Sequence, residues 1–390
     1  MTPEGASGVL FLSHTGDRTG APMALLHLVR WLHRETDLRC GVLFREPGPL
    51  VDAFAEVGPT FVDPGSERLL WRGLRKAGLA DAGQVLRRGR FAPLLAELGP
   101  VDAVYSNTLT NGPLLAALSP LEVPVISHCH ELGHWIRHRI PPLDLRTTLA
   151  ATDHFVAASA AVAEHLHDGL GVAADRTTIV HEFVEVDAID AIDRSSTRAS
   201  IRAELGLPED AFVVGGAGTT DPRKGTDLFV QLARLTPAGV HFVWIGGDDP
   251  VSLAQHRRDA ELMGTGARVH LIGERSDAPG AFAAFDALAL TSREDPYPLV
   301  MLECAALGVP MVCFDGSGGG PEFAAGGAAI AVPHLDADAM AEALTTLAST
   351  PSASSALGQR ARAKVVAENR VELAGARIAS VIRDVVARSG

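Results

Sequence analysis

The sequence predicts an α/β fold with two Rossmann-like domains, each a doubly wound parallel sheet, facing each other across a cleft. Short apolar, β-branched segments alternate with longer helical patterns, and this rhythm stops near residues 188–208 and then resumes. The chain has 390 residues, a length that suits two domains of about 150 to 200 residues each. Open parallel sheets bind ligands beyond the carboxyl ends of their strands, so we expect the chemistry in the loops that follow strands.

Residues 1–187 are assigned to an N-terminal Rossmann-like domain. Each expected strand in this half is a short apolar run, and each is followed by a helical pattern long enough to cross back over a sheet. The expected strands are 9–12, 41–44, 103–105, 123–127 and 154–157.

The second half repeats this organisation. Residues 188–208 are interpreted as the interdomain connection and 209–370 as a C-terminal Rossmann-like domain. Residues 371–390 form a final helix that is expected to pack back on the N-terminal domain. The expected strands of the second sheet are 212–214, 241–245, 269–272, 287–290, 311–314 and 329–332.

Composition and charge exclude several classes of protein. Apolar residues make up 47% and charged residues 21% of the chain, which excludes a chain that is mainly intrinsically disordered. Lysine plus arginine against aspartate plus glutamate gives 34 − 47 = −13, so we expect no nucleic acid partner. The four cysteines lie far apart without a Cys-x-x-Cys pair, which fits a reducing cytoplasm. The apolar run 8–12 is too short for a membrane span, so any membrane contact is expected to be peripheral.

The first loop with a chemical signature follows the strand 9–12. Gly20 lies in it, just before an amphipathic helix over 23–32. A glycine there lets the backbone approach a ligand closely, and the helix start offers unpaired N–H groups to an anion. An ordinary strand-to-helix turn explains the loop equally well.

A second glycine-rich loop follows the strand 212–214. It contains Gly218 and Thr219 and ends with Arg223 and Lys224 at a helix start. The Gly-x-Gly-x-x-Gly spacing of dinucleotide-binding loops fails here, and the chain has no Gly-Lys-Ser/Thr phosphate loop. Positive charge at a helix N-terminus opposes the helix dipole, so the Arg-Lys pair favours a diphosphate site over a merely solvated helix start.

The most specific stretch is 291–310, which follows the apolar strand 287–290. It carries Glu294 and Asp295 before a Pro-x-Pro turn and starts a helix at Leu299 and Val300. Glu303 lies one turn into that helix, in an apolar run where an unpartnered acid is costly. Carboxylates in such folds accept hydrogen bonds from the two ribose hydroxyls, which is the proposed role of Glu303. A surface glutamate on an amphipathic helix is the alternative.

These motifs together make the chain resemble the retaining glycosyltransferases of family 4, also described as glycosyl transferases group 1. The resemblance covers residues 9–332 and implies a GT-B fold. Its strongest element is the family's Glu-x7-Glu motif, matched by Asp295 and Glu303 and followed by a Gly-Val-Pro turn over 308–310. A glycine-rich loop before Glu322 also matches.

The resemblance implies roles for the acids. Glu303 would bind the nucleotide ribose, Asp295 would lie near the hydroxyls of the donor sugar, and a shift by one residue would give that place to Glu294. The family has glutamate at the first position, so the aspartate is a departure from its motif.

The resemblance also implies that Lys224 contacts the donor diphosphate. The family's arginine after the glycine-rich strand is absent, because Gly218 and Thr219 stand in its place. Arg223 is the residue that would compensate.

In the first half the resemblance includes Gly20, as a glycine near the phosphates, and a strand-end histidine that faces the donor sugar. His130 matches that histidine better than His128, because an acidic residue follows it directly. The His-x-His pair alone is explained as well by backbone hydrogen bonds, and zinc is disfavoured because no third ligand follows at metal spacing.

We therefore expect a retaining glycosyltransferase that needs no metal and no cofactor. It would move a sugar from a nucleotide-diphosphate sugar on the C-terminal domain to an acceptor hydroxyl on the N-terminal domain. The acceptor would be a glycan, a lipid-linked molecule or a small-molecule natural product. The expected catalytic residues are His130, Lys224 and Asp295. A nucleotide-sugar epimerase or hydrolase of the same fold, and a catalytically silent sugar-nucleotide-binding protein, stay open as alternatives.

Residues 66–98 form a basic, amphipathic segment. Seven basic residues against three acidic ones give 7 − 3 = +4 in a chain whose net charge is −13. Such a segment suits an anionic acceptor or peripheral binding at the inner face of an anionic membrane. Two ordinary helices with solvated faces are the alternative.

Overall fold

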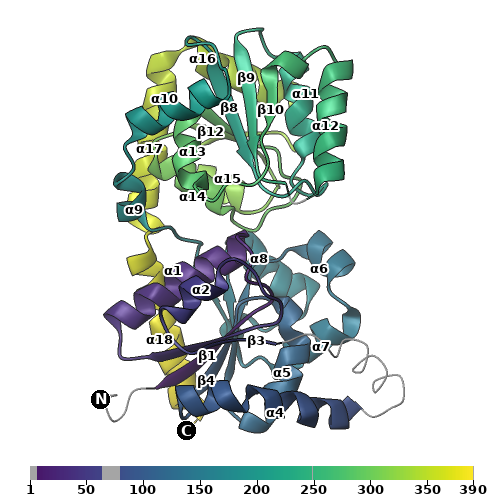
Figure 1. Ribbon diagram of the computed structural model, residues 1–390, viewed down its shortest axis with the longest axis vertical. Helices are drawn as coiled ribbons and strands as arrows, with labels where there is room; N and C mark the ends of the chain where they lie inside the picture. The colour runs from purple at the N-terminus through teal and green to yellow at the C-terminus, as the bar shows by residue number, and fades with distance from the viewer. Residues whose placement is uncertain (1–6, 64–79, 248, 390) are drawn as a thin grey trace. The chain divides into compact units, whose positions relative to one another are not determined.

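The computed structural model describes residues 7–63, 80–247 and 249–389, and for 80–88 the backbone only. It divides into two compact units, which can be followed in Figure 1, where the colour changes with residue number. The first unit combines Met1–His181 with Val371–Gly390, and the second is Glu182–Arg370. Each unit holds one parallel sheet with its own core.

The sheet of the first unit has seven parallel strands in the order β3-β2-β1-β4-β5-β6-β7. The direction of winding reverses between β1 and β4, so this sheet has a topological switch point there. The strands are β1 (Gly8–Ser13), β2 (Arg39–Phe44), β3 (Thr60–Val62), β4 (Ala103–Ser106), β5 (Val125–Cys129), β6 (His154–Ala157) and β7 (Thr177–Ile179).

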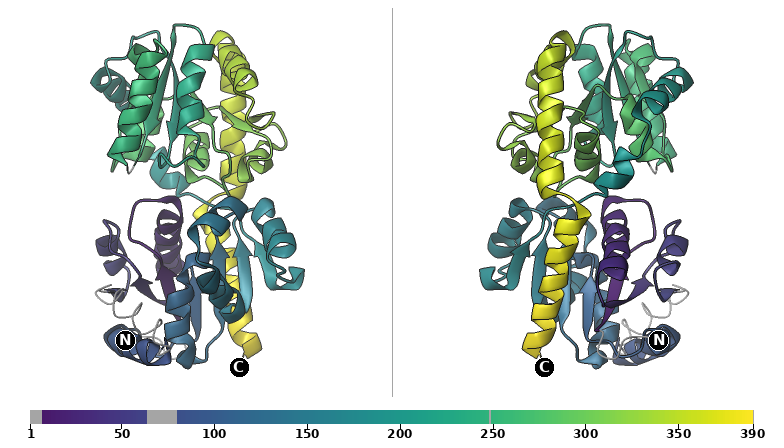
Figure 2. Two further views of the ribbon diagram at one scale, coloured as in Figure 1. Left: turned by 90° about the vertical axis from the view of Figure 1, so that its right-hand side faces the viewer. Right: turned by 90° about the vertical axis from the view of Figure 1, so that its left-hand side faces the viewer.

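Helices pack on this sheet and bury its apolar side chains. The last helix of the chain, α18, lies beside α1 within the unit, as Figure 2 shows. Gly375 of α18 faces the indole of Trp31, where an added Cβ would come within 2.4 Å of the ring. The helices are α1 (Gly20–Glu35), α2 (Val51–Ala55), α4 (Ala80–Leu98), α5 (Gly112–Leu118), α6 (Gly133–Arg139), α7 (Pro142–Ala151), α8 (Ala160–Glu164) and α18 (Val371–Ser389).

Two strands of this sheet, β3 and β7, were not predicted. Each has three residues, all half-buried, and they form the two edges of the sheet. A short edge strand buries little apolar surface, so it lacks the run of apolar residues that identifies an inner strand.

The sheet of the second unit has six parallel strands in the order β10-β9-β8-β11-β12-β13. Its switch point lies between β8 and β11. Val213 and Val214 belong to two different core clusters, so both faces of β8 are covered. The strands are β8 (Phe212–Ala217), β9 (Val240–Ile245), β10 (Val269–Leu271), β11 (Ala287–Leu290), β12 (Met311–Phe314) and β13 (Ile330–Val332).

The helices of the second unit complete its two core layers. They are α9 (Val186–Asp190), α10 (Arg194–Glu204), α11 (Thr226–Leu235), α12 (Pro250–Leu262), α13 (Ala278–Ala281), α14 (Leu299–Ala306), α15 (Gly319–Ala324), α16 (Ala337–Ser349) and α17 (Pro351–Glu368).

The segment expected as an interdomain connection, 188–208, differs from that expectation. It belongs to the second unit, where α10 is bound to the start of β11 by ion pairs. Asp286 accepts from Arg198 at 2.6 Å and from Arg202 at 2.5 Å. The polar, arginine-rich sequence of α10 is therefore that of a helix whose arginines pair with a carboxylate. The chain passes from the first unit to the second at residue 182 instead.

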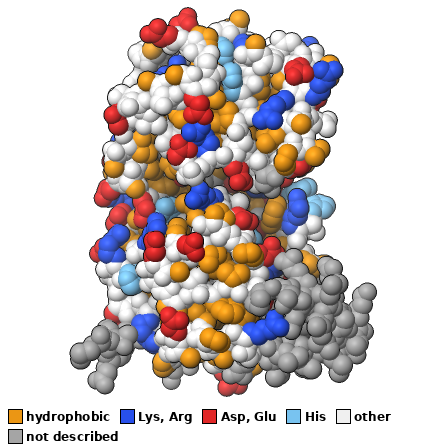
Figure 3. Space-filling view, viewed as in Figure 1, with side chains coloured by type: hydrophobic (Ala, Val, Ile, Leu, Met, Phe, Trp, Pro, Cys, Tyr) orange, Lys and Arg blue, Asp and Glu red, His pale blue; other side chains and the backbone are white. Residues whose placement is uncertain are grey.

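The basic segment 66–98 falls largely outside the described residues. Of its described part, α4 buries Phe91, Leu94 and Leu98 in the core of the first unit. On the face shown in Figure 3, the basic and acidic side chains of the described residues are interspersed. No helix among the described residues is long and apolar enough to cross a membrane.

Candidate functional site

The predicted residues of the second unit gather at the carboxyl ends of three adjacent strands. Loops follow β8 at 218–225, β11 at 291–298 and β12 at 315–318. β8 and β11 flank the switch point of this sheet, and open parallel sheets bind ligands beyond the strand ends at such a point.

Glycine allows the first two of these loops to meet. Gly225 has a φ of +69°, and an added Cβ would lie 2.0 Å from the carbonyl oxygen of Thr291. The hydroxyl of Thr291 in turn donates to the carbonyl oxygen of Lys224 at 3.1 Å. The neighbouring Gly218 has a φ of +141°, and its carbonyl accepts from the indole N–H of Trp244 at 3.2 Å. The close contact between the backbones of these two loops therefore fixes the position of the Lys224 backbone, from which its side chain extends.

Arg293 ties the same two loops together. Its guanidinium binds both carboxylate oxygens of Asp227, at 2.8 and 2.7 Å, and donates to the carbonyl of Pro222 at 2.7 Å. Its backbone N–H donates to the carbonyl of Arg223 at 2.7 Å. A bidentate pair with two further backbone bonds restrains the loop that carries Arg223 and Lys224.

Asp295 is the centre of a group that we term the Asp295 cluster, made of the buried Asp295 and Ser292 and the half-buried Lys224 and Arg223. Its Oδ2 lies 2.6 Å from Lys224 Nζ, 3.2 Å from Ser292 Oγ and 3.6 Å from Arg223 Nη1. Asp295 is only 6% exposed. Burial acts to raise the pKa of Asp295. The charges of Lys224 and Arg223, together with the hydrogen bonds from Lys224 and Ser292, outweigh burial and hold the pKa below its ordinary value. Asp295 is therefore a carboxylate at neutral pH.

A second carboxylate lies beside the cluster. Asp221 accepts from the backbone N–H of Arg223 at 2.9 Å and from the hydroxyl of Thr219 at 2.8 Å, and the Nε of Arg223 lies 3.9 Å from it. Thr219, where the arginine of the resembled family is missing, thus shapes the loop through Asp221. Lys224 has three N–H donors, so an anionic ligand can bind to it while Asp295 accepts one of them.

Glu294 and Asp295 take different places. Asp295 pairs with Gly318 as an isolated parallel bridge, and its side chain points into the cluster. Glu294 contributes its carbonyl oxygen, which accepts from Arg223 Nη1 at 2.9 Å, while its side chain is half-exposed.

The helix after this loop begins with unpaired backbone groups. Pro298 caps α14 in extended geometry without a side-chain hydrogen bond, and Leu299 and Val300 are half-buried at the helix start. Glu303 is half-buried one turn further on. Glu322 is half-buried in α15. Along the chain, the start of α14 and then Glu303 follow the loop that holds Asp295.

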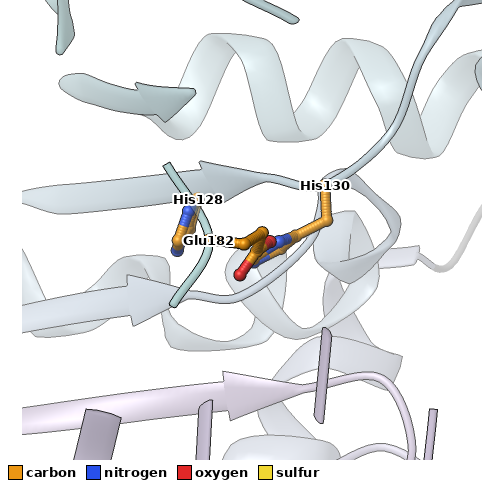
Figure 4. A group of neighbouring side chains, drawn as sticks. All are labelled: His128, His130 and Glu182. Atoms are coloured by element: carbon orange, nitrogen blue, oxygen red, sulfur yellow. The ribbon is translucent and has the colours of Figure 1, made fainter. Parts of the chain in front are cut away.

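In the first unit the predicted histidine lies at the carboxyl end of β5. His130 Nε2 is 3.1 Å from Asn107 Oδ1, and Asn107 follows β4, the neighbouring strand. His128 is buried, and its Nδ1 is 2.8 Å from the hydroxyl of Tyr105 on β4. Figure 4 shows the two histidine side chains, whose ring centres are 3.9 Å apart. One nitrogen of each ring is thus engaged by a group from β4.

Two histidines whose pKa values respond to His130 are neutral. Burial, with the charges of Arg45 and His130, lowers the pKa of His14 to about 4. Burial, with the charge of His130, lowers the pKa of His128 well below its ordinary value. At neutral pH both rings are uncharged, and His130 is the more exposed of the two β5 histidines.

Gly20 is exposed at the first position of α1, and an added Cβ would meet no atom within 4 Å. Packing within the chain therefore does not require glycine there. Thr19, the N-cap of α1, makes no side-chain capping bond.

Sequence reasoning missed Ser292, Arg293 and Asn107. Each is a polar residue directly after a strand next to a switch point, and that position was a usable signal. The partners of Arg293 and Asn107 could not be predicted from the sequence, because these contacts join segments that are distant along the chain. Ser292 contacts Asp295 within one loop.

Comparison with known proteins finds a matching family model for each half of the chain. Residues 210–350 match the family described as Glycosyl transferases group 1, and residues 18–188 match the one described as Glycosyltransferase Family 4. The chain is 27% identical over 323 residues to D-inositol 3-phosphate glycosyltransferase of Xylanimonas cellulosilytica, covering 76% of each protein. It is also 27% identical over 295 residues to D-inositol 3-phosphate glycosyltransferase 1 of Catenulispora acidiphila, covering 69% of each.

Solved structures share the fold. HepE of Anabaena, crystallised with UDP and glucose, matches with a TM-score of 0.81 and 20% identity, over 96% of this chain and 99% of HepE. WaaG, a glycosyltransferase involved in lipopolysaccharide biosynthesis, matches with a TM-score of 0.69 and 15% identity, over 96% of this chain and 99% of WaaG. The two sheets thus have the architecture of GT-B glycosyltransferases.

Proposed function

We propose that this chain, which belongs to the family 4 glycosyltransferases of group 1, moves a sugar from a nucleotide-diphosphate sugar to an acceptor hydroxyl, with retention and without a metal ion. The observation that carries the proposal is the bond between Lys224 and Asp295, which joins two loops at the carboxyl edge of the sheet. It places a cation beside a carboxylate, Asp295, that lies four residues before the start of α14. The cation suits a diphosphate, and the carboxylate can accept a hydrogen bond from a sugar hydroxyl.

The leaving group determines what the site must do. A departing nucleoside diphosphate gains negative charge as the glycosidic bond breaks, and fixed donors aimed at that charge lower the barrier. Lys224 and Arg223, with the first N–H groups of α14 at Leu299 and Val300, are the donors proposed to receive it. These groups would do the work that a magnesium ion does in metal-dependent transferases.

The carboxylates would hold the rest of the donor. Glu303 is proposed to accept from the ribose hydroxyls and Asp295 from the hydroxyls of the sugar. His130 in the first unit is proposed to contact the sugar as well. Attack by the acceptor on the face from which the phosphate leaves, assisted by that phosphate, would retain the anomeric configuration.

The printed names of similar proteins suggest the substrates to try first. HepE was crystallised with UDP-glucose, so UDP-sugars are the proposed donors. Two relatives are named D-inositol 3-phosphate glycosyltransferases, so a phosphorylated polyol is the first acceptor to offer, followed by glycan and lipid-linked acceptors.

Release of UDP from UDP-sugars, measured with and without acceptors, tests the proposal. A glycosyltransferase releases UDP at a rate that depends on the acceptor and forms a glycosylated product visible by mass spectrometry. UDP release at the same rate without any acceptor would identify a hydrolase. Interconversion of the sugar would identify an epimerase, and donor binding without any turnover would identify a silent binding protein.

A further inference from the structure

We propose that Asn107 is a positioning residue that holds His130 as the tautomer carrying its proton on Nε2. The relevance to catalysis rests on the proposed function, in which His130 contacts the sugar. The tautomer itself follows from hydrogen-bond chemistry within the first unit.

The orientation of the Asn107 amide is set by its other partner. Its Nδ2 donates to the carbonyl oxygen of Ala21 at 2.7 Å. A carbonyl oxygen only accepts, so the NH2 group of Asn107 must face Ala21 and cannot be exchanged with Oδ1. Ala21 lies in the first turn of α1, so a helix holds that carbonyl in place.

The remaining atom of the amide then determines the state of His130. Asn107 Oδ1 faces His130 Nε2 at 3.1 Å, and an amide oxygen accepts but never donates. Nε2 must therefore carry a hydrogen. Asn107 is only 1% exposed, so water cannot readily replace either bond.

Glu131 keeps the two loops at this spacing. Its carboxylate accepts from the backbone N–H of His130 at 3.0 Å, from the backbone N–H of Leu109 at 3.2 Å and from the hydroxyl of Thr108. The residues it binds are His130 itself and the two that follow Asn107. The loops after β4 and β5 are thus fastened together beside the Asn107–His130 bond.

This arrangement has a consequence for the chemistry. When the ring is neutral, a proton on Nε2 makes Nδ1 the hydrogen-bond acceptor.

Nitrogen NMR of the histidine-labelled full chain tests the inference. The spectrum would be recorded near pH 8.5, about 2 units above the ordinary histidine pKa of about 6.5, so that the ring is neutral. The His130 signals are assigned by their loss in His130→Gln. We expect the proton on Nε2, and a proton on Nδ1 would overturn the inference.

Variants separate a specific role from general loop stability. Asn107→Leu removes the acceptor and should leave His130 as a mixture of tautomers. Asn107→Asp retains an oxygen acceptor for Nε2–H, although it loses the N–H donated to Ala21, so it should keep more of the proton on Nε2 than Asn107→Leu does. Asn111→Leu is the matched control, because Asn111 is also fully buried but binds Leu12 and Ser106, so it should leave the His130 signals unchanged. A full Nε2–H population in Asn107→Leu would refute the role of Asn107.

Activity provides a second readout. Asn107→Leu should lower kcat about threefold to tenfold, the loss expected for one hydrogen bond, with little change in the donor KM. Asn107→Asp should recover part of that loss, because it restores the acceptor but not the donor to Ala21. The tautomer measurement needs no sugar, so absence of sugar transfer would count against the proposed function and leave the inference on Asn107 standing.

Discussion

Lys224 Nζ and Asp295 Oδ2 lie 2.6 Å apart, although their residues are 71 positions apart in the chain. The two groups come from loops on either side of the switch point of the second sheet. Gly225 and Arg293 bring those loops together, the first by allowing close backbone contact and the second by binding Asp227. The pair is therefore held in place by the fold, and it joins the group suited to a diphosphate to the group suited to a sugar.

Loss of Lys224 should mainly slow the reaction. Lys224→Ala is expected to lower kcat more than it raises the donor KM, because the charge on the leaving group grows toward the transition state. A loss of about tenfold to hundredfold corresponds to one charged hydrogen bond of about 1.5 to 3 kcal/mol. Steady-state kinetics with a UDP-sugar measures it.

Arg223→Ala should cost less than Lys224→Ala. The guanidinium of Arg223 is already bound to the carbonyl of Glu294, and it lies 3.6 Å from Asp295, farther than Lys224 does. A greater defect in Arg223→Ala would show that Arg223 has taken the place of the arginine missing at Thr219.

Asp295→Asn should cost more in turnover than Glu294→Gln. Asp295 is buried in the cluster, whereas Glu294 contributes its backbone carbonyl and has a half-exposed side chain. The expected loss is about tenfold to hundredfold for Asp295→Asn, because a hydroxyl loses a charged acceptor. Affinity for UDP should be unchanged or higher, since Lys224 and Arg223 lose a competing anion. If Glu294→Gln is the more damaging change, the acidic motif is shifted by one residue.

Glu303→Ala should weaken donor binding without unfolding the chain. Removal of the carboxylate takes away hydrogen bonds to ribose, and we expect about a tenfold to hundredfold loss of affinity in calorimetry. Glu342→Ala, at an exposed position of α16, is the control and should bind donor normally. Equal affinities for the two variants would contradict the role assigned to Glu303.

Arg293→Ala should lower donor affinity although Arg293 need not touch the donor. The change releases the loop that carries Arg223 and Lys224, because it removes the bidentate pair with Asp227. Arg258→Ala removes an exposed ion pair with Glu261 on α12 and is the matched control. Donor affinity that falls equally in both variants would point to a general effect of lost arginine charge.

Activity should survive dialysis against a strong chelator. Lys224, Arg223 and the start of α14 supply the positive groups that a diphosphate needs, so no divalent cation is expected to be required. Complete loss of turnover that magnesium or manganese restores would show that a metal takes part.

Much of the fold could be predicted from the sequence because inner strands are apolar runs. The strands 154–157, 287–290 and 311–314 were predicted with the bounds they have. The edge strands β3 and β7 could not be, since three half-buried residues carry no clear pattern. The segment 188–208 was interpreted as a connection because the alternation of strand and helix patterns stops there. The partner of Arg198 and Arg202, Asp286, lies more than 80 residues away.

The candidate site was predictable at single positions but not in its pairing. Asp295, Glu303 and Lys224 have local signals, namely an acidic pair before a Pro-x-Pro turn, an acid in an apolar helix and a cation at a helix start. The bonds of Asp295 to Lys224 and of His130 to Asn107 join separate loops, and their geometry depends on the order of strands in the sheet. The order of the strands is set by tertiary packing, and no local motif predicts it.

Calorimetric titration of UDP and UDP-glucose into the wild-type chain and into Lys224→Ala tests the central claim most directly, namely that the Asp295 cluster is the donor site. We predict that the wild-type chain binds both ligands. Lys224→Ala should bind UDP, which carries the full charge of the leaving group, about tenfold or more weakly, and the loss for UDP-glucose should be smaller. Equal binding by the two proteins would contradict the claim that the donor diphosphate lies at Lys224.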